Sequence, residues 1–255
     1  TGSYIPGRIL TNDDIAQMVE TNDAWIQERT GIARRHIISG DESTATMSAE
    51  ASKKALEMSG IAPEENDMII LSTASPNAVV PCVACQVQEM IGAKNAVCYD
   101  LNAACSGFLY AYCTAQAFIR SGIYKTILII GAESLSNLVN WKDRSTCILF
   151  GDGAGAAVVQ ADPDAPFECV LHSDGSKGDA LAKATPYTKG LPEEAYNMTM
   201  DGKEIFMFAV KRIPEVVREL MEKLPICAED IDLFVLHQAN ARIVEAAVKK
   251  LKLPL

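Results

Sequence analysis

Short apolar runs alternate with amphipathic segments along the first two thirds of the chain. The runs Met68–Ser72, Ala96–Leu101 and Thr126–Ile130 are typical of buried strands. Between them, about Thr46–Ser59 and Val83–Ile91 have the apolar spacing of helices. Strands and helices that alternate in this way predict a mostly parallel sheet with helices on both faces.

Helix and strand signals also occur near the beginning of the chain. Thr11–Asp14 has the pattern of a capping box and predicts a short helix at Ile15–Val19. A second cap at Thr21–Asp23 predicts a helix that ends at Gly31. The polar segment Ala33–Ile38 is predicted to follow as a strand.

A glycine-rich segment, Gly151–Ala156, formally matches the dinucleotide fingerprint G-x-G-x-x-A. That fingerprint must open a helix, whereas the following Ala157–Gln160 has a strand pattern, so nicotinamide or flavin binding is rejected and a glycine turn between strands is expected. Asp162–Pro166 predicts a boundary, Phe167–Ser173 a new strand, and Gly175–Tyr196 a surface loop.

One segment of the chain recurs. Ile61 and Asp67, before the first buried strand, reappear as Ile226 and Asp232 at a constant offset of 165 residues. Duplication explains the match and predicts two pseudo-symmetric halves, divided as residues 1–162 and 167–255. Since the counterpart of Cys105 would fall beyond the last residue, we expect the second half to be incomplete.

Composition excludes several classes of function. A chain of 255 residues that is 49% hydrophobic can bury a large core, and its net charge of −10 argues against a nucleic-acid partner. The sequence shows no membrane span and no signal peptide, so we expect a cytoplasmic protein that does not bind membranes.

The chain has eight cysteines, most of them in apolar runs typical of reduced core residues. Cys82 and Cys85 form a C-x-x-C pair without a second pair at zinc-site spacing, and a structural helix face is favoured over a redox or zinc site. No metal site is predicted.

Cys105 lies between a predicted strand and a predicted helix, Ser106–Arg120. Near a helix N-terminus, unpaired N–H groups and the helix dipole favour thiolate over thiol, as a nucleophile requires. Gly107 would leave room for a second molecule to approach the sulfur. A free cysteine is equally often a small core residue, so both interpretations stay open.

His237-Gln238-Ala239-Asn240 follows a predicted buried strand, Leu233–Leu236, and precedes a predicted helix, Ala241–Leu251. The carboxyl ends of strands are where open α/β sheets bind ligands, although a lone histidine is more often structural. Trp25 and Arg29 share a helix face and suit an adenine and a phosphate, but a half-buried tryptophan beside an exposed arginine is the simpler interpretation.

Together these motifs resemble a known family. Ala104-Cys105-Ser106-Gly107-Phe108, His237-Gln238-Ala239-Asn240, Trp25-Ile26-x-x-Arg29-Thr30-Gly31-Ile32 and Gly151-Asp152-Gly153-Ala154-Gly155 resemble β-ketoacyl-acyl-carrier-protein synthase III, the initiating condensing enzyme of type II fatty-acid synthesis. The resemblance implies a thiolase-like α/β fold of two pseudo-symmetric βαβαβ halves in layers α/β/α/β/α. By this comparison the chain is truncated at both ends.

The resemblance also implies the chemistry. Cys105 would attack an acyl-coenzyme A, acetyl-coenzyme A above all, and hold the acyl group while malonyl-acyl-carrier protein is decarboxylated. His237 would stabilise the developing enolate, with no cofactor beyond the coenzyme A thioester that serves as substrate. The family further implies a homodimer.

Further residues match family positions that bind the two substrates. The coenzyme A positions are Trp25, Arg29, Arg144, Gly202, Phe206 and Asn240. The carrier-protein positions are Gln238, Ala239, Asn240, Ala241, Arg242, Lys249 and Lys250. The lysines also suit capping of a helix C-terminus, and both roles can hold. Met207 stands where the family often has a basic residue, and residues 75–80 match the segment that shapes the acyl pocket.

Two elements of the family pattern are missing from the sequence: an Asn on a Gly-Asn turn beyond the histidine, and a glycine-rich C-terminal segment. Three alternatives therefore remain beside a condensing enzyme of fatty-acid synthesis. They are a related condensing enzyme of secondary metabolism, an inactive fragment that binds coenzyme A or carrier protein, and, least favoured, a cysteine protease.

Overall fold

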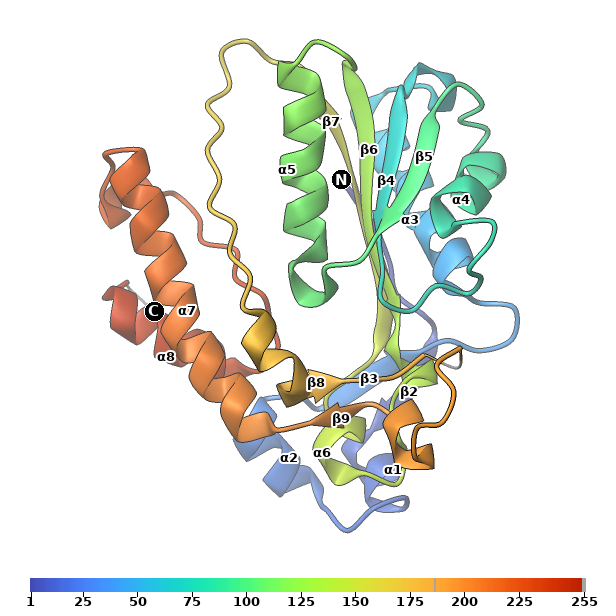
Figure 1. The fold of residues 1–255 in the computed structure, drawn as a ribbon, viewed down its shortest axis with the longest axis vertical. Coiled ribbons are helices and arrows are strands. Elements are labelled where there is room, and N and C mark those ends of the chain that lie inside the picture. Colours follow the sequence, from blue (N-terminus) through green and yellow to red (C-terminus); the bar gives the residue numbers. More distant parts are fainter. Residues whose placement is uncertain (186, 254–255) are drawn as a thin grey trace. The chain divides into compact units, whose positions relative to one another are not determined.

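The structure is a computed structural model that describes residues 1–185 and 187–253 (Figure 1). Its strands are β1 (Gly2–Tyr4), β2 (Arg8–Thr11), β3 (Arg34–Ile37), β4 (Met68–Ser72), β5 (Val97–Leu101), β6 (Thr126–Ser134), β7 (Asp152–Gln160), β8 (Leu181–Ala182) and β9 (Thr199–Met200). Its α-helices are α1 (Asn12–Ala16), α2 (Asp23–Thr30), α3 (Thr44–Ser59), α4 (Val83–Ile91), α5 (Gly107–Arg120), α6 (Arg144–Cys147), α7 (Gly202–Lys223) and α8 (Ala241–Leu251).

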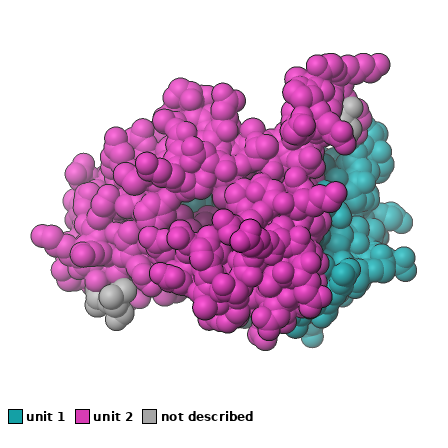
Figure 2. All heavy atoms as spheres, turned by 90° about the horizontal axis from the view of Figure 1, so that it is seen from below, with its two compact units in different colours: residues 1–9, 36–137, 151–167 teal, residues 10–35, 138–150, 168–255 magenta. Residues whose placement is uncertain are grey.

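The described chain divides into two compact units, coloured in Figure 2. Unit 1 contains residues 1–9, 36–137 and 151–167, and unit 2 contains residues 10–35, 138–150 and 168–255. These units group residues by contacts and not by the internal repeat, so the division into residues 1–162 and 167–255 stays a prediction.

Unit 1 is built around a five-stranded sheet of order β1-β7-β6-β4-β5. Strand β4 pairs in parallel with β5 and β6, whereas β7 pairs antiparallel with β6 and β1. A parallel pair needs a crossover connection, usually a helix packed on the sheet. The connection between β6 and β7, residues 138–150, belongs to unit 2 and is not a crossover helix of unit 1. The sheet is therefore mixed, and the prediction of a mostly parallel sheet was wrong in this respect.

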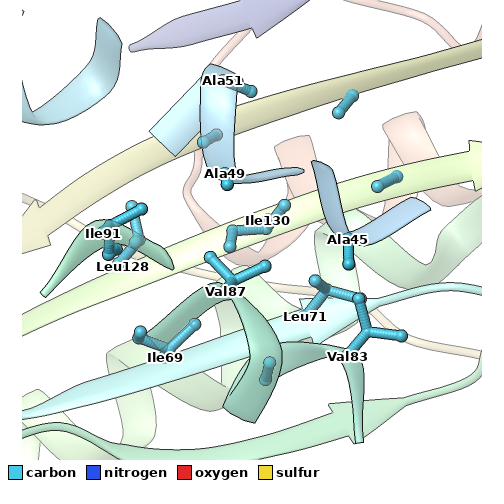
Figure 3. Packing of buried hydrophobic residues seen from close by; sticks show 14 of the residues in the cluster. Ala45, Ala49, Ala51, Ile69, Leu71, Val83, Val87, Ile91, Leu128 and Ile130 are labelled. Atoms are coloured by element: carbon cyan, nitrogen blue, oxygen red, sulfur yellow. The ribbon is translucent and has the colours of Figure 1, made fainter. Parts of the chain in front are cut away.

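Alternation of side chains along β4 and β6 fills a core on each face of this sheet. Ile69, Leu71, Leu128 and Ile130 point to the face covered by α3 and α4, as Figure 3 shows. Met68, Ile70, Ile127 and Ile129 point to the face covered by α5, where they meet Ala111 and Ala115. Period-two alternation with both faces apolar explains why each strand reads as a continuous apolar run.

Two elements of unit 1 are less buried than the sequence predicts. Strand β5 lies at the edge of the sheet, and its Val97 is 50% exposed. Helix α5 buries only Gly107, Ala111 and Ala115, while Leu109 is 61% exposed. An edge strand is covered by a neighbouring strand on one side only, and a helix that packs on a sheet buries only one stripe of its surface. The apolar composition of β5 and α5 therefore led us to predict more buried side chains than the structure has.

The glycine-rich segment is a strand and not the predicted turn. Gly153 and Gly155 lie within β7, paired with Glu133 and Gly131 of β6, and neither has a positive φ. At the start of the strand, the carboxylate of Asp152 accepts hydrogen bonds from the amides of Ile38 (2.7 Å) and Ser136 (2.8 Å). Because a strand and not a helix follows the first glycine, the geometry of a dinucleotide fingerprint is absent here.

Two of the predicted strands in the second part of the chain are absent from the structure. The predicted strands Phe167–Ser173 and Leu233–Leu236 are not strands, and Leu233 and Val235 are 76% and 81% exposed. A strand requires hydrogen bonds to a neighbour, and among the described residues neither segment has a paired strand. Helix α7, for which no helical pattern was identified in the sequence, packs on α8.

The internal repeat is visible in local geometry. A 3₁₀ turn at Pro63–Glu65 recurs at Ala228–Asp230, at the same offset of 165 residues as in the sequence. In each, the last acidic side chain accepts a hydrogen bond from the amide preceding the turn: Ala62 to Glu65 at 2.9 Å, and Cys227 to Asp230 at 2.9 Å. The first turn leads into β4, whereas the second leads into an irregular segment.

Candidate functional site

Cys105 lies in a short 3₁₀ turn, Ala104–Ser106, between β5 and α5. Ala104 adopts a left-handed φ of 44°, and its amide donates to the side chain of Asn102 at 3.2 Å. Helix α5 begins at Gly107, so the predicted change from strand to helix around Cys105 is confirmed. The strained residue before the sulfur indicates a turn whose geometry its surroundings enforce.

Gly107 is required by a neighbour within the protein; that it also leaves room for a second molecule at the sulfur, as the sequence suggested, stays a prediction. A β-carbon at Gly107 would lie 1.8 Å from Oγ of Ser72, the last residue of β4. Gly131 of β6 likewise lies against Phe108, because a β-carbon added at Gly131 would lie 3.2 Å from the Phe108 ring. The first residues of α5, directly after the cysteine turn, therefore rest on the end of β4 and on β6.

The electrostatic environment of Cys105 differs from the prediction. The residue is exposed, yet the protein atoms around its thiol desolvate it and raise its pKa, and the negative charge of Glu133 raises that pKa further. A backbone hydrogen bond acts in the opposite direction and is outweighed. The helix N-terminus thus does not make Cys105 a resting thiolate.

Glu133, near the end of β6, was not identified from the sequence. Its carboxylate accepts hydrogen bonds from the amide of Ala74 (2.8 Å), the hydroxyl of Ser75 and, more weakly, the hydroxyl of Thr73 (3.5 Å). Burial raises the pKa of Glu133, against the effect of these donors. An acidic residue that directly follows an apolar run was the available clue in the sequence.

His237 lies in the irregular segment before α8 and is exposed. Desolvation by the surrounding protein lowers the pKa of its imidazole, so the neutral ring prevails at neutral pH. Asn240 has a structural role, because its side chain accepts a hydrogen bond from the amide of Ile243 at 3.0 Å and caps α8. That His237 acts with Cys105 stays a prediction.

Three of the predicted nucleotide-binding residues meet in unit 2. The guanidinium of Arg29 lies 4.7 Å from the centroid of the Trp25 ring, and that of Arg144 lies 4.6 Å from it. Arg144 also donates to the carbonyl of Glu20 at 2.9 Å. An aromatic plate with two cations against it suits a nucleotide that carries phosphates.

The remaining predicted positions lie on α7 and α8. Gly202 is the first residue of α7, and Phe206, one turn later, lies 5.6 Å from the guanidinium of Arg242. Gln238 and Ala239 precede the cap of α8, and Ala241 and Arg242 form its first turn. Close packing positions this turn, because a β-carbon at Gly31 would lie 2.9 Å from that of Ala241.

At the other end of α8, Lys249 and Lys250 occupy the last turn. The Lys250 ammonium donates to the carbonyl of Val210 in α7 at 3.2 Å, and Arg218 of α7 donates to the carbonyl of Lys250 at 2.7 Å. Lys250 therefore joins the two helices. Met207, which stands on α7 where the family often has a basic residue, is 60% exposed. Docking by this surface stays a prediction.

Two further features of the described chain concern metals and membranes. In the part of the chain that the structure describes, no three histidine, cysteine, aspartate or glutamate side chains are arranged to hold a metal ion. Cys82 precedes the first residue of α4, with its sulfur 3.3 Å from that of Cys85. None of the helices in residues 1–185 and 187–253 combines the length and apolar character needed to cross a bilayer.

Comparison with known proteins identifies the family. The profile of 3-oxoacyl-[acyl-carrier-protein] synthase III matches residues 99–175, and that of its C-terminal part matches residues 221–255. A β-ketoacyl-[acyl-carrier-protein] synthase III of Clostridium acetobutylicum is 49% identical over 99% of this chain and 79% of its own length. The chain belongs to the β-ketoacyl-acyl-carrier-protein synthase III family.

Other members of the synthase III family agree in sequence and structure. The relative from Erythrobacter litoralis is 44% identical over the whole chain and 80% of its own length. The crystal structure of 3-oxoacyl-[acyl-carrier-protein] synthase III from Aquifex aeolicus superimposes with a TM-score of 0.92 at 42% identity, covering 99% of this chain and 80% of that one. The fold is thus thiolase-like, as the sequence predicted, and the family is one of condensing acyltransferases.

Proposed function

We propose that this chain catalyses the decarboxylating condensation of an acyl-coenzyme A, acetyl-coenzyme A above all, with malonyl-acyl-carrier protein. The product would be a 3-oxoacyl-acyl-carrier protein, which starts type II fatty-acid synthesis. Family membership at 49% identity supports the reaction class. The observation that carries the proposal in this chain is the turn that presents Cys105 at the start of α5.

In the first half-reaction, the sulfur of Cys105 attacks the thioester carbonyl, and the coenzyme A thiolate leaves. Because the pKa of Cys105 is raised, its proton has to depart as the new carbon–sulfur bond forms, and the leaving thiolate is the natural acceptor. Amides at the start of α5, which have no partner within the helix, supply hydrogen bonds to the carbonyl oxygen as it becomes negative.

In the second half-reaction, the malonyl group loses carbon dioxide, and its electron pair forms a carbanion stabilised as an enolate. A neutral His237, which its lowered pKa provides, donates a hydrogen bond to the thioester oxygen as that charge develops. The carbanion then attacks the acyl-cysteine, and the Cys105 thiolate leaves and takes up a proton. No cofactor or metal enters these steps.

Substrate binding is assigned to surfaces of unit 2. Trp25, Arg29 and Arg144 would hold the adenine and phosphates of coenzyme A, since their ring and guanidinium groups are already stacked. Gly202 and Phe206 would contact the pantetheine chain, and Asn240 would orient bound groups through the cap of α8. The carrier protein, which is acidic, would dock on the segment 238–242 with Lys249 and Lys250.

The proposal includes two properties that the family implies, a homodimer and a cytoplasmic location. Sedimentation at micromolar concentration tests the first, and cell fractionation tests the second. A monomer that still forms the acyl adduct would remove the dimer from the proposal without affecting the chemistry.

The proposed function is tested in two stages. The protein is incubated with acetyl-coenzyme A, and intact mass spectrometry is expected to show one acetyl adduct that the Cys105→Ser variant lacks. Addition of malonyl-acyl-carrier protein should then discharge the adduct and yield 3-oxobutyryl-carrier protein. An adduct without condensation would indicate an inactive fragment that keeps the nucleophile, and the absence of any adduct would refute the proposal.

A second candidate has a specific observation in its favour. The priming β-ketosynthase of the R1128 polyketide pathway superimposes with a TM-score of 0.93 at 34% identity. A condensing enzyme of secondary metabolism would use the same Cys105 chemistry with another primer or acceptor. Competition between acetyl-coenzyme A and longer acyl-coenzyme A primers for the adduct distinguishes the two.

A further inference from the structure

Two cysteine side chains meet at the start of α4. Cys82 directly precedes the helix, and its extended backbone (φ −62°, ψ 155°) places it at the N-cap position. Cys85 follows three residues later, within the first turn. An N-cap side chain is directed at this turn, because it normally accepts a hydrogen bond from one of the amides there. In this protein the Cys82 thiol instead donates to the sulfur of Cys85, at a sulfur–sulfur distance of 3.3 Å.

The cap of α4 is supplied by another residue. The two carboxylate oxygens of Asp100, on β5, accept hydrogen bonds from the first two amides of the helix, those of Val83 (2.7 Å) and Ala84 (2.8 Å). The Cys82 side chain makes no capping hydrogen bond. A change in the bonding of the Cys82 sulfur therefore leaves the cap of the helix intact.

The same arrangement affects the balance between dithiol and disulfide. Free amides at a helix N-terminus stabilise a cysteine thiolate, and a pair whose reduced form is stabilised in this way has a disulfide that is easily reduced. At the start of α4 the first two amides are already bound to the carboxylate of Asp100. The reduced pair lacks their stabilisation, so a disulfide between Cys82 and Cys85 should persist once it has formed.

The pair is positioned to react. A disulfide bond is about 2 Å long, so sulfurs that lie 3.3 Å apart need to approach by about 1.3 Å, which small side-chain rotations provide. Both cysteines are free and partly exposed. The residues before them are open to solvent, with Val79 and Val80 62% and 85% exposed. A small reagent can therefore reach the sulfurs from the side of this segment.

We propose that Cys82 and Cys85 are a redox site, which forms a reversible disulfide by exchange with a small-molecule disulfide of the glutathione type. The sequence pattern alone favoured a structural helix face for this pair. The contact between the sulfurs and the cap supplied by Asp100 are the observations that favour a redox role. The proposal goes beyond the proposed condensation and does not depend on it.

The exchange takes place in two steps. The Cys82 thiolate, next to the exposed segment, attacks one sulfur of the small disulfide, whose sulfur–sulfur bond breaks as one thiolate leaves and takes up a proton. The Cys85 thiolate then attacks the Cys82 sulfur of the mixed disulfide, and the second small thiolate leaves and is protonated. Two protein thiols are oxidised to one disulfide, and one small disulfide is reduced to two thiols.

The test compares the pair in the folded and in the unfolded protein. The full chain is equilibrated without oxygen in glutathione buffers with an increasing proportion of glutathione disulfide, both in plain buffer and in concentrated urea. Free thiols are then blocked with iodoacetamide, and the protein is digested with trypsin. The tryptic peptide of residues 55–94 contains Cys82 and Cys85 and no other cysteine, so its mass reports on this pair alone.

In the folded protein, the internal disulfide is expected to need at least about tenfold less glutathione disulfide than in urea, because the fold raises the effective concentration of one sulfur at the other. Dithiothreitol should reverse it. In Cys82→Ser and Cys85→Ser, the remaining cysteine should carry a glutathione adduct instead. Equal transitions in folded and unfolded protein, or glutathione adducts on both cysteines of the wild type, would overturn the proposal.

The contribution of Asp100 is measured in the same way with Asp100→Asn. Asparagine is itself a good N-cap residue, so α4 should remain folded, but a neutral side chain binds the two amides less strongly. The thiolate then gains their stabilisation, and the transition is expected to need at least about threefold more glutathione disulfide. An unchanged transition would remove Asp100 from the proposal. Failure of the acetyl adduct at Cys105 would refute the proposed function and leave the result for Cys82 and Cys85 unaffected.

Discussion

The carboxylate of Asp100 in β5 accepts a hydrogen bond from the amide of Val83, the first residue of α4, at 2.7 Å. Its second oxygen accepts from the amide of Ala84 at 2.8 Å. Cys82, which precedes the helix, makes no such cap with its own side chain. Asp100, five positions before Cys105, thus supplies the N-terminal cap of α4 that Cys82 does not provide.

Replacement of Asp100 by alanine should leave these amides unpaired and destabilise the protein. The expected loss in the free energy of unfolding is about 2 kcal/mol, since two charge-assisted hydrogen bonds at a helix N-terminus are removed. Urea unfolding followed by circular dichroism measures it, with exposed Asp41→Ala as the control. Equal midpoints for the two variants would contradict the capping role.

Alanine at Gly107 should disrupt the cysteine turn. The added β-carbon would overlap Oγ of Ser72 at 1.8 Å, so the turn or the end of β4 has to move. We expect a loss of about 2 kcal/mol or more in stability and of most acyl-adduct formation. Gly155→Ala, where a β-carbon has no neighbour within 4 Å, is the matched control.

A double-mutant cycle tests the origin of the Gly107 effect. Removing the hydroxyl with Ser72→Ala should recover part of the stability lost in Gly107→Ala, because the closest atom is gone. Strictly additive losses would show that the damage arises elsewhere.

The thiol of Cys98 should be inert at ordinary pH. Burial, followed by the nearby Cys85 and Cys82, raises its pKa to about 12. Iodoacetamide at pH 8.5 is expected to leave the Cys98 peptide unmodified while exposed Cys227 reacts. Rapid modification of Cys98 in the folded protein would contradict its burial.

The same shift predicts a pH dependence of stability. An unfolded cysteine loses its proton near pH 9, whereas folded Cys98 keeps it up to about pH 12. In this window the folded state binds more protons, so the contribution of Cys98 is complete below pH 9 and is lost as the pH rises towards 12. Cys98→Ala should show a shallower decline of urea stability in that range than wild type.

His237→Ala should separate the two half-reactions. Its neutral imidazole is assigned to the enolate, so the variant is expected to form the acetyl adduct at Cys105 at nearly the wild-type rate. Decarboxylation of malonyl-carrier protein, measured as released carbon dioxide, should fall by at least about 100-fold, the usual loss for one oxyanion donor. Loss of the adduct itself would assign His237 to the first step.

Local sequence patterns predicted correctly those elements that also find a neighbour to pair or pack with in the structure. The bounds of β4, α4 and α8 were predicted as they stand, because an apolar run at Met68–Ser72 and amphipathic runs at 83–91 and 241–251 leave few alternatives. The capping box at Thr11 and Asp14 was also confirmed. The predicted strand at Leu233–Leu236 failed because a strand is defined by its neighbour, which an apolar pattern does not supply.

Properties that depend on distant residues were beyond sequence reasoning. The helix N-terminus near Cys105 was visible along the chain, but burial and Glu133, on another strand, decide the direction of the thiol pKa. The requirement for glycine at position 107 likewise comes from Ser72, which lies 35 residues earlier. Trp25 and Arg29 were paired by helix spacing, whereas Arg144 was assigned to the nucleotide site by the family resemblance alone, and its stacking on the Trp25 ring was not predicted.

The two similar acidic turns, Pro63–Glu65 and Ala228–Asp230, explain why the internal repeat is visible at these positions. Each closes on itself through one carboxylate and one amide three residues apart, so it needs no partner from elsewhere. Such a self-contained bend can form whether or not the strand that follows it is paired. The two turns are therefore the places where the repeat is easiest to recognise in the structure, whatever the pairing of the segment that follows.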